Sequence, residues 1–308
     1  MRRAVLLPNP SASGFTGGAF RGVAAALAES FDVVASWADG PEDATRRAAK
    51  AAADGVDVAI AMGGDGVIHH VANGLTHTDT ALGIIPAGTT NVLARILSLP
   101  RSSIAAAQEI GGYEAQDQTL ALVTSGTDGP QARHAMFAMG VGFDADVVAV
   151  AERRQHSKQR LGSLHFARTA VAQVFGDYRH KVPALRVRCD GRTVEAVAVM
   201  IQVHDRYTYL GRIPMFLASD GGAGITAVAI ADVGPKAAVS VIRHSVLKRS
   251  LEEAPGCVVF RDFSKLTIEA DPATPYQADG EVLGTAGRLE VTPSPAALRI
   301  LVPPLSAR

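Results

Sequence analysis

Cysteine is scarce in this chain of 308 residues, which contains only Cys189 and Cys257. Neither belongs to a CxxC pair or to the short ligand spacing of a structural zinc site. Two such thiols indicate a reduced protein without a disulfide framework. Net charge is lacking too, because 30 Lys and Arg residues balance 30 Asp and Glu residues. This balance argues against a protein whose main partner is nucleic acid.

Long apolar runs are also absent. Near the N-terminus the run Ala4–Leu7 ends at Pro8, which is too short for a signal peptide. No stretch approaches the roughly 20 apolar residues of a transmembrane helix. Apolar residues still make up 47% of the chain and charged residues 19%, so a large core can be buried. We therefore expect a cytoplasmic protein. If its substrate is a lipid, the protein must meet the membrane from its surface.

The chain is long enough for two domains of roughly 100 to 200 residues each, and its two parts differ in pattern. Before about residue 120, short apolar runs alternate with helical segments, which predicts an α/β domain with a parallel sheet and ligands at the carboxyl ends of its strands. The strands expected there are Ala4–Leu7, Asp32–Ala35, Val56–Met62 and Ala81–Ile85.

After about residue 120, many short strands separated by turn residues predict an antiparallel β-rich domain with one helical insertion at about 145–175. The expected strands are Leu120–Thr124, His134–Gly140, Ala184–Cys189, Ala196–Val203, Thr226–Ile230, Lys265–Glu269 and Arg288–Val291. We expect the first domain to cover 1–121 and the second 122–297. The tail at about 298–308 is expected to return to the first domain.

The strongest local signal is the turn Gly63-Gly64-Asp65-Gly66, between a buried strand and a helical stretch. Glycines let the backbone approach a phosphate closely, and a helix N-terminus presents free N–H groups to an anion. Asp65, expected in an exposed turn, has the chemistry to hold a metal ion or to orient a hydroxyl. An ordinary strand-to-helix turn is the alternative, and the position at a strand's carboxyl end favours phosphate binding.

A second small-residue turn, Gly88-Thr89-Thr90-Asn91, follows the next strand and opens another helical run. Its hydroxyls and carboxamide have the reach for phosphate or ribose oxygens, while Thr90 alone also fits a plain helix N-cap. The chain has only three asparagines, and each lies in or beside one of these early loops: Asn9, Asn73 and Asn91. Together the two turns predict a nucleotide site.

Other nucleotide and metal motifs are missing. The chain contains no GxxxxGK[ST] and no Gly-Lys pair, so it is not a P-loop protein. No GxGxxG opens the first helix, and Gly14, Gly17 and Gly18 are expected to form a loop. HExxH is absent as well.

A set of motifs, in its order along the chain, resembles the diacylglycerol kinase catalytic family, which includes bacterial lipid kinases, sphingosine kinases and ceramide kinases. No single motif is specific, but the combination is, and it spans nearly the whole chain. The motifs are Asn9-Pro10 with Ser13-Gly14, Gly63–Leu75, Pro86–Asn91 with Ala94-Arg95, Gly142–Ala145, Ser219–Gly221 and Asp279–Glu281.

The resemblance implies a Rossmann-like, NAD kinase-like α/β domain followed by a β-rich antiparallel sandwich. It implies transfer of the ATP γ-phosphate, with Mg²⁺, to a lipid hydroxyl in a cleft between the domains. Asp279 would be the general base with Glu281 as its acidic neighbour, beside a role for Asp65. Asp279-Gly280 also fits a plain hairpin turn. The nucleotide would be bound by Asn9, Gly63, Gly64, Asp65, Gly66, Gly88, Thr89, Thr90 and Asn91.

Several positions depart from the family pattern. His70 replaces an expected acidic residue on the metal side, and Val92 replaces an aspartate of many bacterial members. The segment His204–Tyr207 stands where many relatives carry an Asn-Gly pair. Asp220 is the candidate metal ligand, although an aspartate that often follows it is missing. The basic run Arg153–Arg160 fits either anionic lipid headgroups or a solvated helix face.

We therefore predict an ATP-dependent lipid kinase that contacts the membrane surface. A nucleotide- and lipid-binding pseudokinase is the alternative, favoured by His70 and Val92. A kinase for a soluble acceptor is disfavoured, because NAD kinases share the glycine loop but carry a later Asn-Glu pair, and no Asn follows Asn91. Diacylglycerol, a sphingoid base, phosphatidylglycerol and a glycolipid all stay open as substrates, as does a homodimer.

Overall fold

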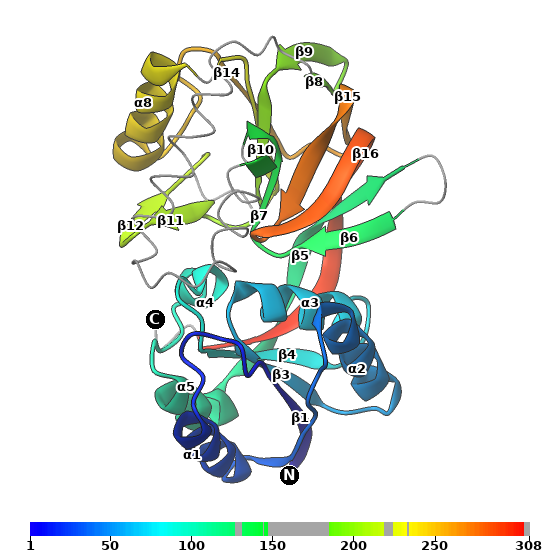
Figure 1. The fold of residues 1–308 in the computed structure, drawn as a ribbon, viewed down its shortest axis with the longest axis vertical. Coiled ribbons are helices and arrows are strands. Elements are labelled where there is room, and N and C mark those ends of the chain that lie inside the picture. The colour runs from blue at the N-terminus through cyan, green and yellow to red at the C-terminus, as the bar shows by residue number, and fades with distance from the viewer. Residues whose placement is uncertain (127–130, 144, 147–184, 219–223, 233, 305–308) are drawn as a thin grey trace. The chain divides into compact units, whose positions relative to one another are not determined.

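A computed structural model describes residues 1–126, 131–143, 145–146, 185–218, 224–232 and 234–304 (Figure 1). The chain divides into two compact units. Unit 1 comprises Met1–Leu120 with Ser294–Arg308, and unit 2 comprises Ala121–Pro293. Two strands, β5 (Glu114–Ser125) and β16 (Glu281–Val302), carry the chain from one unit to the other. The expected helical insertion at 145–175 lies outside the described residues apart from 145–146.

Unit 1 is built on a parallel sheet in the order β2-β1-β3-β4, followed by the end of β16. Every residue of β3 and β4 is buried, as in a sheet that helices cover on both faces. The predicted parallel α/β sheet is thus confirmed. The strand bounds are β1 (Arg2–Pro8), β2 (Phe31–Ala35), β3 (Val58–Gly63) and β4 (Ala81–Pro86).

Helices cover the two faces of this sheet in pairs: α1 packs with α5 on one face, and α2 with α3 on the other (Figure 1). The expected loop at Gly17 and Gly18 is wrong, because these residues open α1. Thr16 caps that helix, and its hydroxyl accepts the Ala19 N–H at 3.0 Å. The helices are α1 (Gly17–Ala28), α2 (Pro41–Ala53), α3 (Asp65–Leu75), α4 (Val92–Ile96) and α5 (Ser103–Glu109), followed by the 3₁₀ turn η1 (Ile110–Gly112).

The strand order of unit 1 reverses between β1 and β3. From β1 the chain crosses to β2 at one edge, whereas from β3 it crosses to β4 in the opposite direction. In open α/β sheets, ligands bind outside the carboxyl ends of the strands at such a switch point. Asn9 directly follows β1, and Gly64 directly follows β3. The fold therefore places two of the predicted nucleotide loops where this architecture binds ligands.

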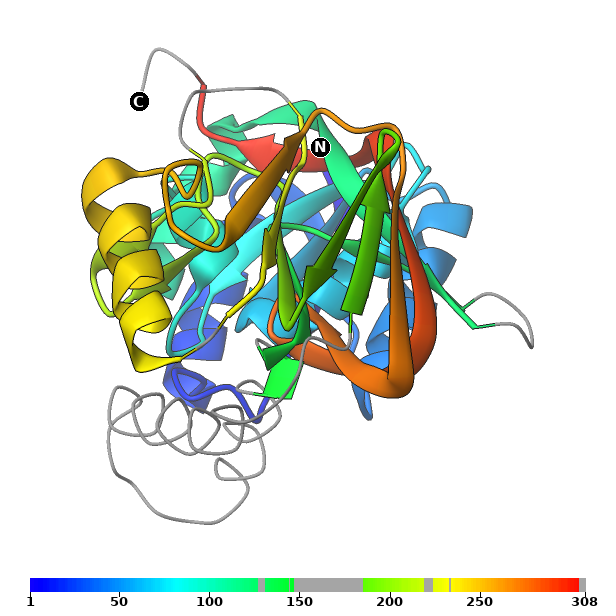
Figure 2. The same cartoon turned by 90° about the horizontal axis from the view of Figure 1, so that it is seen from above.

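Unit 2 is built from antiparallel strands in the order β14-β13-β10-β7-β15-β16, with β8 between β15 and β9 and with β5 paired to β6. The predicted β-rich antiparallel domain is confirmed. In Figure 2 the orange strands β15 and β16 form one long curved pair, whose register shifts between Glu269 and Thr274. The remaining elements are β6 (Gln131–Ala135), β7 (Ala138–Gly142), β8 (Leu185–Cys189), β9 (Arg192–Ala196), β10 (Ala198–Gln202), β11 (Thr208–Leu210), β12 (Ile213–Met215), β13 (Thr226–Ile230), helix α8 (Pro235–Arg243), π-helical turn η2 (His244–Lys248), β14 (Cys257–Arg261) and β15 (Leu266–Ala278).

One expected strand of unit 2, His134–Gly140, is interrupted. The structure bends at Met136 and Phe137, which separate β6 from β7. The N–H groups of both residues bind the carboxylate of Asp279 instead of a neighbouring strand. The expectation of one continuous strand was wrong because its hydrogen-bond partner lies about 140 residues further along the chain.

Candidate functional site

Three loops of unit 1 meet at the carboxyl ends of β1, β3 and β4, where backbone hydrogen bonds join them. The Asn9 N–H donates to the Met62 carbonyl at 2.9 Å, and the Ala87 N–H donates to the Gly63 carbonyl at 2.8 Å. The Gly14 N–H donates to the Ala87 carbonyl, also at 2.8 Å. The predicted nucleotide-binding residues from all three loops are thus brought together at the switch point of the sheet.

The loops after β3 and β4 approach each other at two glycines. A Cβ atom on Gly88 would overlap the Gly64 Cα and would lie 2.8 Å from the Asn91 Oδ1. A Cβ on Gly63 would overlap the Val67 side chain. Such contacts exclude any side chain at Gly63 and Gly88. The glycines are therefore required by the close approach of the two loops.

Asn91 braces the second loop from within. Its backbone is left-handed, with φ 49°, a conformation that asparagine tolerates better than most residues. Its Oδ1 accepts the Gly88 N–H at 2.9 Å, and its Nδ2 donates to the Gly88 carbonyl at 2.8 Å. The carboxamide that the sequence offers to phosphate or ribose thus holds the turn in shape. Asn91, not Thr90, is the N-cap of α4.

The two hydroxyl-bearing residues of the second loop, Thr89 and Thr90, are exposed. Thr89 lies 2.9 Å from the hydroxyl of Ser13, measured between the two oxygens. This contact ties the loop after β4 to the loop after β1. The sequence gives no local signal for this pair, because the residues are 76 positions apart.

Asp65 is the first residue of α3 and is partly buried, not exposed as expected. Its Oδ2 accepts the Val92 N–H at 2.9 Å, and its Oδ1 accepts the Leu93 N–H at 3.1 Å. The carboxylate therefore caps α4 from outside that helix. These two hydrogen bonds fix the distance between the two glycine loops. The sequence motif does not reveal this structural role of Asp65.

The N-terminus of α3 faces the same loop cluster. Gly64 is its N-cap and provides no side-chain hydrogen bond. The first N–H groups of a helix have no partner within that helix, and the helix dipole favours an anion beside them. The fold thus presents the terminus of an 11-residue helix beside backbone of two glycine loops. This arrangement suits a phosphate group.

The departures at His70 and Val92 have different structural settings. His70 is partly buried on α3, and its carbonyl accepts the hydroxyl of Thr45 from α2 at 2.9 Å. Its ring lies edge-on to that of His69, with 5.2 Å between the centroids. Val92 is 5% exposed and packs in the core of unit 1. An apolar side chain at position 92 therefore belongs to the packing beneath the loop.

The second candidate centre is Asp279, in the hairpin between β15 and β16 of unit 2. Asp279 is 3% exposed and has a left-handed backbone with φ 54°. Its Oδ1 accepts the N–H groups of Met136, Phe137 and Ala138 at 3.0, 2.9 and 3.2 Å, and its Oδ2 lies 2.8 Å from the Met136 nitrogen. The residue does sit in the hairpin turn that Asp-Gly predicts, yet its carboxylate is turned inward to these N–H groups.

Glu281, the predicted acidic neighbour, begins β16 opposite Ala278 and is partly buried. The adjoining Gly280 donates its N–H to the side chain of Gln277 at 2.9 Å. The hairpin that carries both acidic residues is thus braced by side chains as well as by the strand ladder. Asp279 and Glu281 follow one another closely in one rigid turn of unit 2.

His204 lies beside this hairpin and was noted from the sequence only as a departure from the family pattern. Burial lowers the pKa of His204, against the opposing charges of Asp205 and Asp279 and a hydrogen bond to the Met136 backbone. Its Nε2 is buried and has no hydrogen-bond partner among the residues that the structure describes. A neutral imidazole next to Asp279 is the form that this environment favours.

No metal centre is evident in the described parts of the chain. There, no group of three or more His, Cys, Asp or Glu side chains is placed to hold a metal ion. Asp220, the candidate metal ligand, lies outside the described residues, as does the basic run 153–160. Among the described helices, none is long and apolar enough to cross a bilayer. Burial raises the pKa of Cys189 to about 12 and that of Cys257 to about 11, so neither thiol is activated.

Comparison with known proteins gives consistent results for the first part of the chain. Residues 3–125 match the diacylglycerol kinase catalytic domain. A diacylglycerol kinase of Bacillus subtilis (strain 168) is 52% identical over 64 residues, which are 20% of this chain and 21% of that protein. A probable lipid kinase, YegS-like, of Stenotrophomonas maltophilia (strain K279a) is 34% identical over 149 residues, 46% of each chain. The chain thus spans about a fifth to about half of these relatives.

The fold is shared over nearly the full length with a solved structure. The crystal structure of a diacylglycerol kinase from Bacillus anthracis str. Sterne superposes with a TM-score of 0.71. The superposition covers 98% of this chain and 97% of that one, at 20% identity. At this level of identity the likeness establishes the fold of the chain.

Proposed function

Because residues 3–125 match the diacylglycerol kinase catalytic domain, we propose that this chain is an ATP-dependent lipid kinase. The observation that carries the proposal is the close approach of Gly64 and Gly88 at the switch point of the parallel sheet. The N-terminus of α3, which no side chain caps, lies beside the two glycine loops and offers backbone N–H groups to a polyphosphate. Diacylglycerol or a related lipid alcohol would be the acceptor.

The proposed division of labour follows the two units. Unit 1 would hold the nucleotide through Asn9 and the backbone of Gly63–Gly66 and Gly88–Asn91. Unit 2 would supply Asp279 as general base, with Glu281 as its neighbour, in a cleft between the units. The lipid hydroxyl oxygen forms a bond to the γ-phosphorus, the bond from that phosphorus to the ADP oxygen breaks, and the hydroxyl proton passes to the Asp279 carboxylate.

Mg²⁺ would enter with the nucleotide. Magnesium in phosphoryl-transfer sites is commonly held by substrate phosphates and only one or two carboxylates, which agrees with a chain whose described residues hold no three-ligand cluster. Asp65 is the carboxylate of the loop cluster and would be its protein ligand. The ion would neutralise phosphate charge, while the backbone of the glycine loops fixes the phosphate position.

A pseudokinase that binds nucleotide and lipid is the second candidate. It is favoured by the hydrogen bonds of Asp279, whose Oδ1 already accepts three backbone N–H groups. A carboxylate bound in this way has a structural task that does not require catalysis. The replacement of the expected acidic residue by His70 also favours a pseudokinase. Nucleotide binding is common to both candidates, so only turnover separates them.

The experiment is a substrate screen with the full chain. Purified protein is incubated with Mg²⁺, a total bacterial lipid extract and ATP labelled at the γ-phosphate, and the organic phase is separated and analysed. Label in a lipid product identifies the acceptor and supports the kinase. A rise in melting temperature with ATP but no labelled lipid supports the pseudokinase, because a ligand of the folded state alone stabilises it. If the screen gives no labelled lipid and ATP does not raise the melting temperature, both candidates are overturned.

A further inference from the structure

Helix α8 and the following turn η2 of unit 2 expose large apolar side chains. Val239 is 67% exposed, Ile242 41% and Leu247 72%. Val239 and Ile242 are three residues apart on α8 and so lie on the same side of the helix, and Leu247 follows in the next turn. Single exposed apolar residues are ordinary, but a group of them on one element marks a surface that contacts another apolar phase.

Cations surround these apolar side chains. Between Asp232 and Glu252 the chain contains no acidic residue. Lys236, Arg243 and Lys248 are exposed, and none of the three forms an ion pair with another described residue. We call the group Lys236, Val239, Ile242, Arg243, Leu247 and Lys248 the α8 surface. It combines an apolar stripe with one sign of charge.

The hairpin of β11 and β12 continues the same chemistry. Strand β12 contacts η2, and the Phe216 N–H donates to the Ser245 hydroxyl at 3.0 Å. The hairpin exposes Leu210 by 42% and Ile213 by 49%. Exposed apolar side chains therefore occur on α8, on η2 and on the hairpin whose strand β12 contacts η2.

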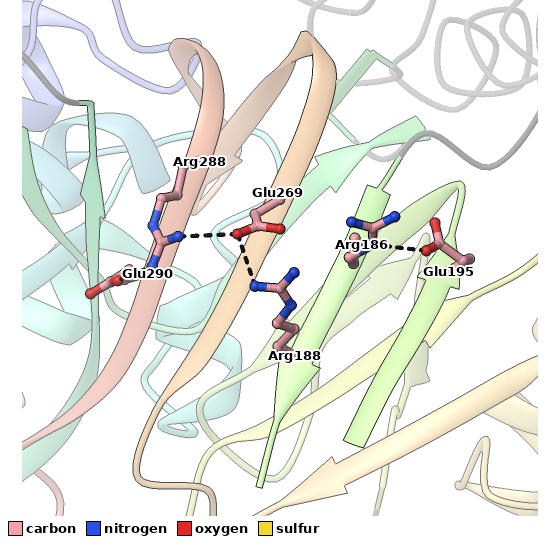
Figure 3. Close-up of polar contacts among 6 residues, drawn as sticks. All are labelled: Arg186, Arg188, Glu195, Glu269, Arg288 and Glu290. Carbon is pink, nitrogen blue, oxygen red and sulfur yellow. Dashed lines mark hydrogen bonds and ion pairs between the residues drawn. The ribbon is translucent and has the colours of Figure 1, made fainter. Parts of the chain in front are cut away.

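On a different face of unit 2, by contrast, the basic side chains are paired with acidic ones. On strands β8, β9, β15 and β16, basic side chains lie beside acidic ones and form ion pairs with them (Figure 3). Glu269 accepts from Arg188 at 3.2 Å and from Arg288 at 3.1 Å, and Arg186 pairs with Glu195 at 3.0 Å. Cations on that face are neutralised within the protein, whereas those of the α8 surface are available to an external anion.

We propose that the α8 surface docks on an anionic membrane. The apolar side chains enter the boundary between headgroups and acyl chains, and the three cations contact anionic headgroups, which is how amphipathic helices lie on bilayers. The proposal rests on the proposed function only in that a kinase of membrane lipids must reach a bilayer. Among occupants, an anionic bilayer matches both features at once, because it offers negative charge at its surface and hydrocarbon beneath.

Vesicle binding of the full chain without nucleotide tests the proposal. The vesicles contain phosphatidylglycerol and phosphatidylcholine in equal parts, or phosphatidylcholine alone. The variant Lys236→Gln/Arg243→Gln/Lys248→Gln is compared with the control Arg186→Gln/Arg188→Gln/Arg288→Gln, which removes the same charge from the ion-paired face. We expect the first to bind anionic vesicles on the order of a hundredfold more weakly, since each cation contributes independently, and the control to bind like the parent chain.

A second measurement locates the contact and does not depend on the charge variants. Leu247→Trp should give a blue shift of emission when anionic vesicles are added, and Val34→Trp, on the 66% exposed position of β2, should give none. Equal losses in the two charge variants, or no shift at Leu247→Trp, would overturn the proposal. The proposal would also be overturned if the parent chain forms a dimer without vesicles and Leu247→Trp abolishes that dimer. This result would assign the α8 surface to contact with a second copy of the chain. Transfer of phosphate to lipid in detergent micelles is assayed separately, so that failure of the kinase leaves the vesicle result standing.

Discussion

The carboxylate of Asp65 accepts the backbone N–H of Val92 at 2.9 Å, so that the first residue of α3 caps the start of α4. A second bond, from Leu93 at 3.1 Å, uses the other carboxylate oxygen. These bonds span 27 and 28 residues and join the loop after β3 to the loop after β4. The two glycine loops are thus joined directly, and we expect a substitution in either loop to change the structure of both.

Replacing Asp65 should therefore reduce stability as well as nucleotide binding. Asp65→Ala removes both capping bonds and is expected to lower the free energy of unfolding by about 1 to 2 kcal/mol. Asp65→Asn should cost about half as much, because the amide oxygen keeps one N–H partner. Urea unfolding measures the difference, with Asp32→Ala on the exposed end of β2 as the control. Equal stability of Asp65→Ala and Asp32→Ala would contradict the capping role.

Gly88 should tolerate no side chain. In Gly88→Ala the new Cβ overlaps the Gly64 Cα, and relief of this clash moves the two loops apart. We expect a loss of about 1 to 3 kcal/mol in stability and at least about tenfold weaker ATP binding by titration calorimetry, because misplaced N–H groups lose their phosphate partners. Gly112→Ala is the matched control, since a Cβ there meets nothing within 4 Å. Unchanged ATP affinity in Gly88→Ala would place the nucleotide elsewhere.

Two Asp-Gly hairpins of unit 2 offer an internal comparison. Asp190 and Asp279 both precede a glycine and have φ near 50°, at 48° and 54°, but Asp190 is exposed and Asp279 is buried. Asp279→Asn keeps one oxygen for the three N–H groups but places an NH2 donor, in place of Oδ2, beside the buried Met136 N–H, so we expect a loss of about 2 kcal/mol in stability. Asp190→Asn should change stability by less than about 0.5 kcal/mol. Equal losses of stability in urea unfolding would show that the loss comes from the turn conformation and not from the buried carboxylate.

Turnover separates the structural from the chemical role of Asp279. If it is the general base, Asp279→Asn should abolish phosphate transfer at temperatures where the variant is still folded, while ATP binding by unit 1 persists. Retained turnover in the folded variant would remove Asp279 from the mechanism.

His204 should make stability depend on pH. Burial lowers the pKa of His204 in the folded chain, whereas the unfolded chain binds a proton near the ordinary pKa of about 6.5. Below that pH the unfolded state holds more protons, so the free energy of unfolding falls as pH falls; above it, this contribution is constant. His204→Gln should flatten the slope between about pH 6.5 and 5. An unchanged slope in His204→Gln would contradict the buried neutral imidazole.

Much of unit 1 is predictable from its sequence, because its signals are local. The buried strands and the turns at Gly63–Gly66 and Gly88–Asn91 are each set by adjacent residues, and strand order then brings the turns together. The roles of individual side chains are less accessible. Asn91 and Asp65 have the chemistry of ligands, yet their hydrogen bonds serve the loops, and only the fold shows which backbone groups lie within reach.

Unit 2 is less predictable for a related reason. At the bend that divides β6 from β7, the backbone N–H groups bind Asp279, about 140 residues away. No local pattern in His134–Gly140 predicts this bend. Long-range partners of this kind are fixed by antiparallel pairing, and hydrophobic periodicity alone does not identify them.

The most direct test of the central claim is transfer of the ATP γ-phosphate to lipid by the parent chain, Gly88→Ala and Gly112→Ala under identical conditions. The three proteins are given labelled ATP, Mg²⁺ and the acceptor lipid dispersed in detergent micelles, and label in the organic phase is counted over time. We predict labelled lipid with the parent chain and Gly112→Ala, and loss of nearly all label with Gly88→Ala. Equal labelling by all three proteins, or no labelling by a parent chain that binds ATP, would contradict the account.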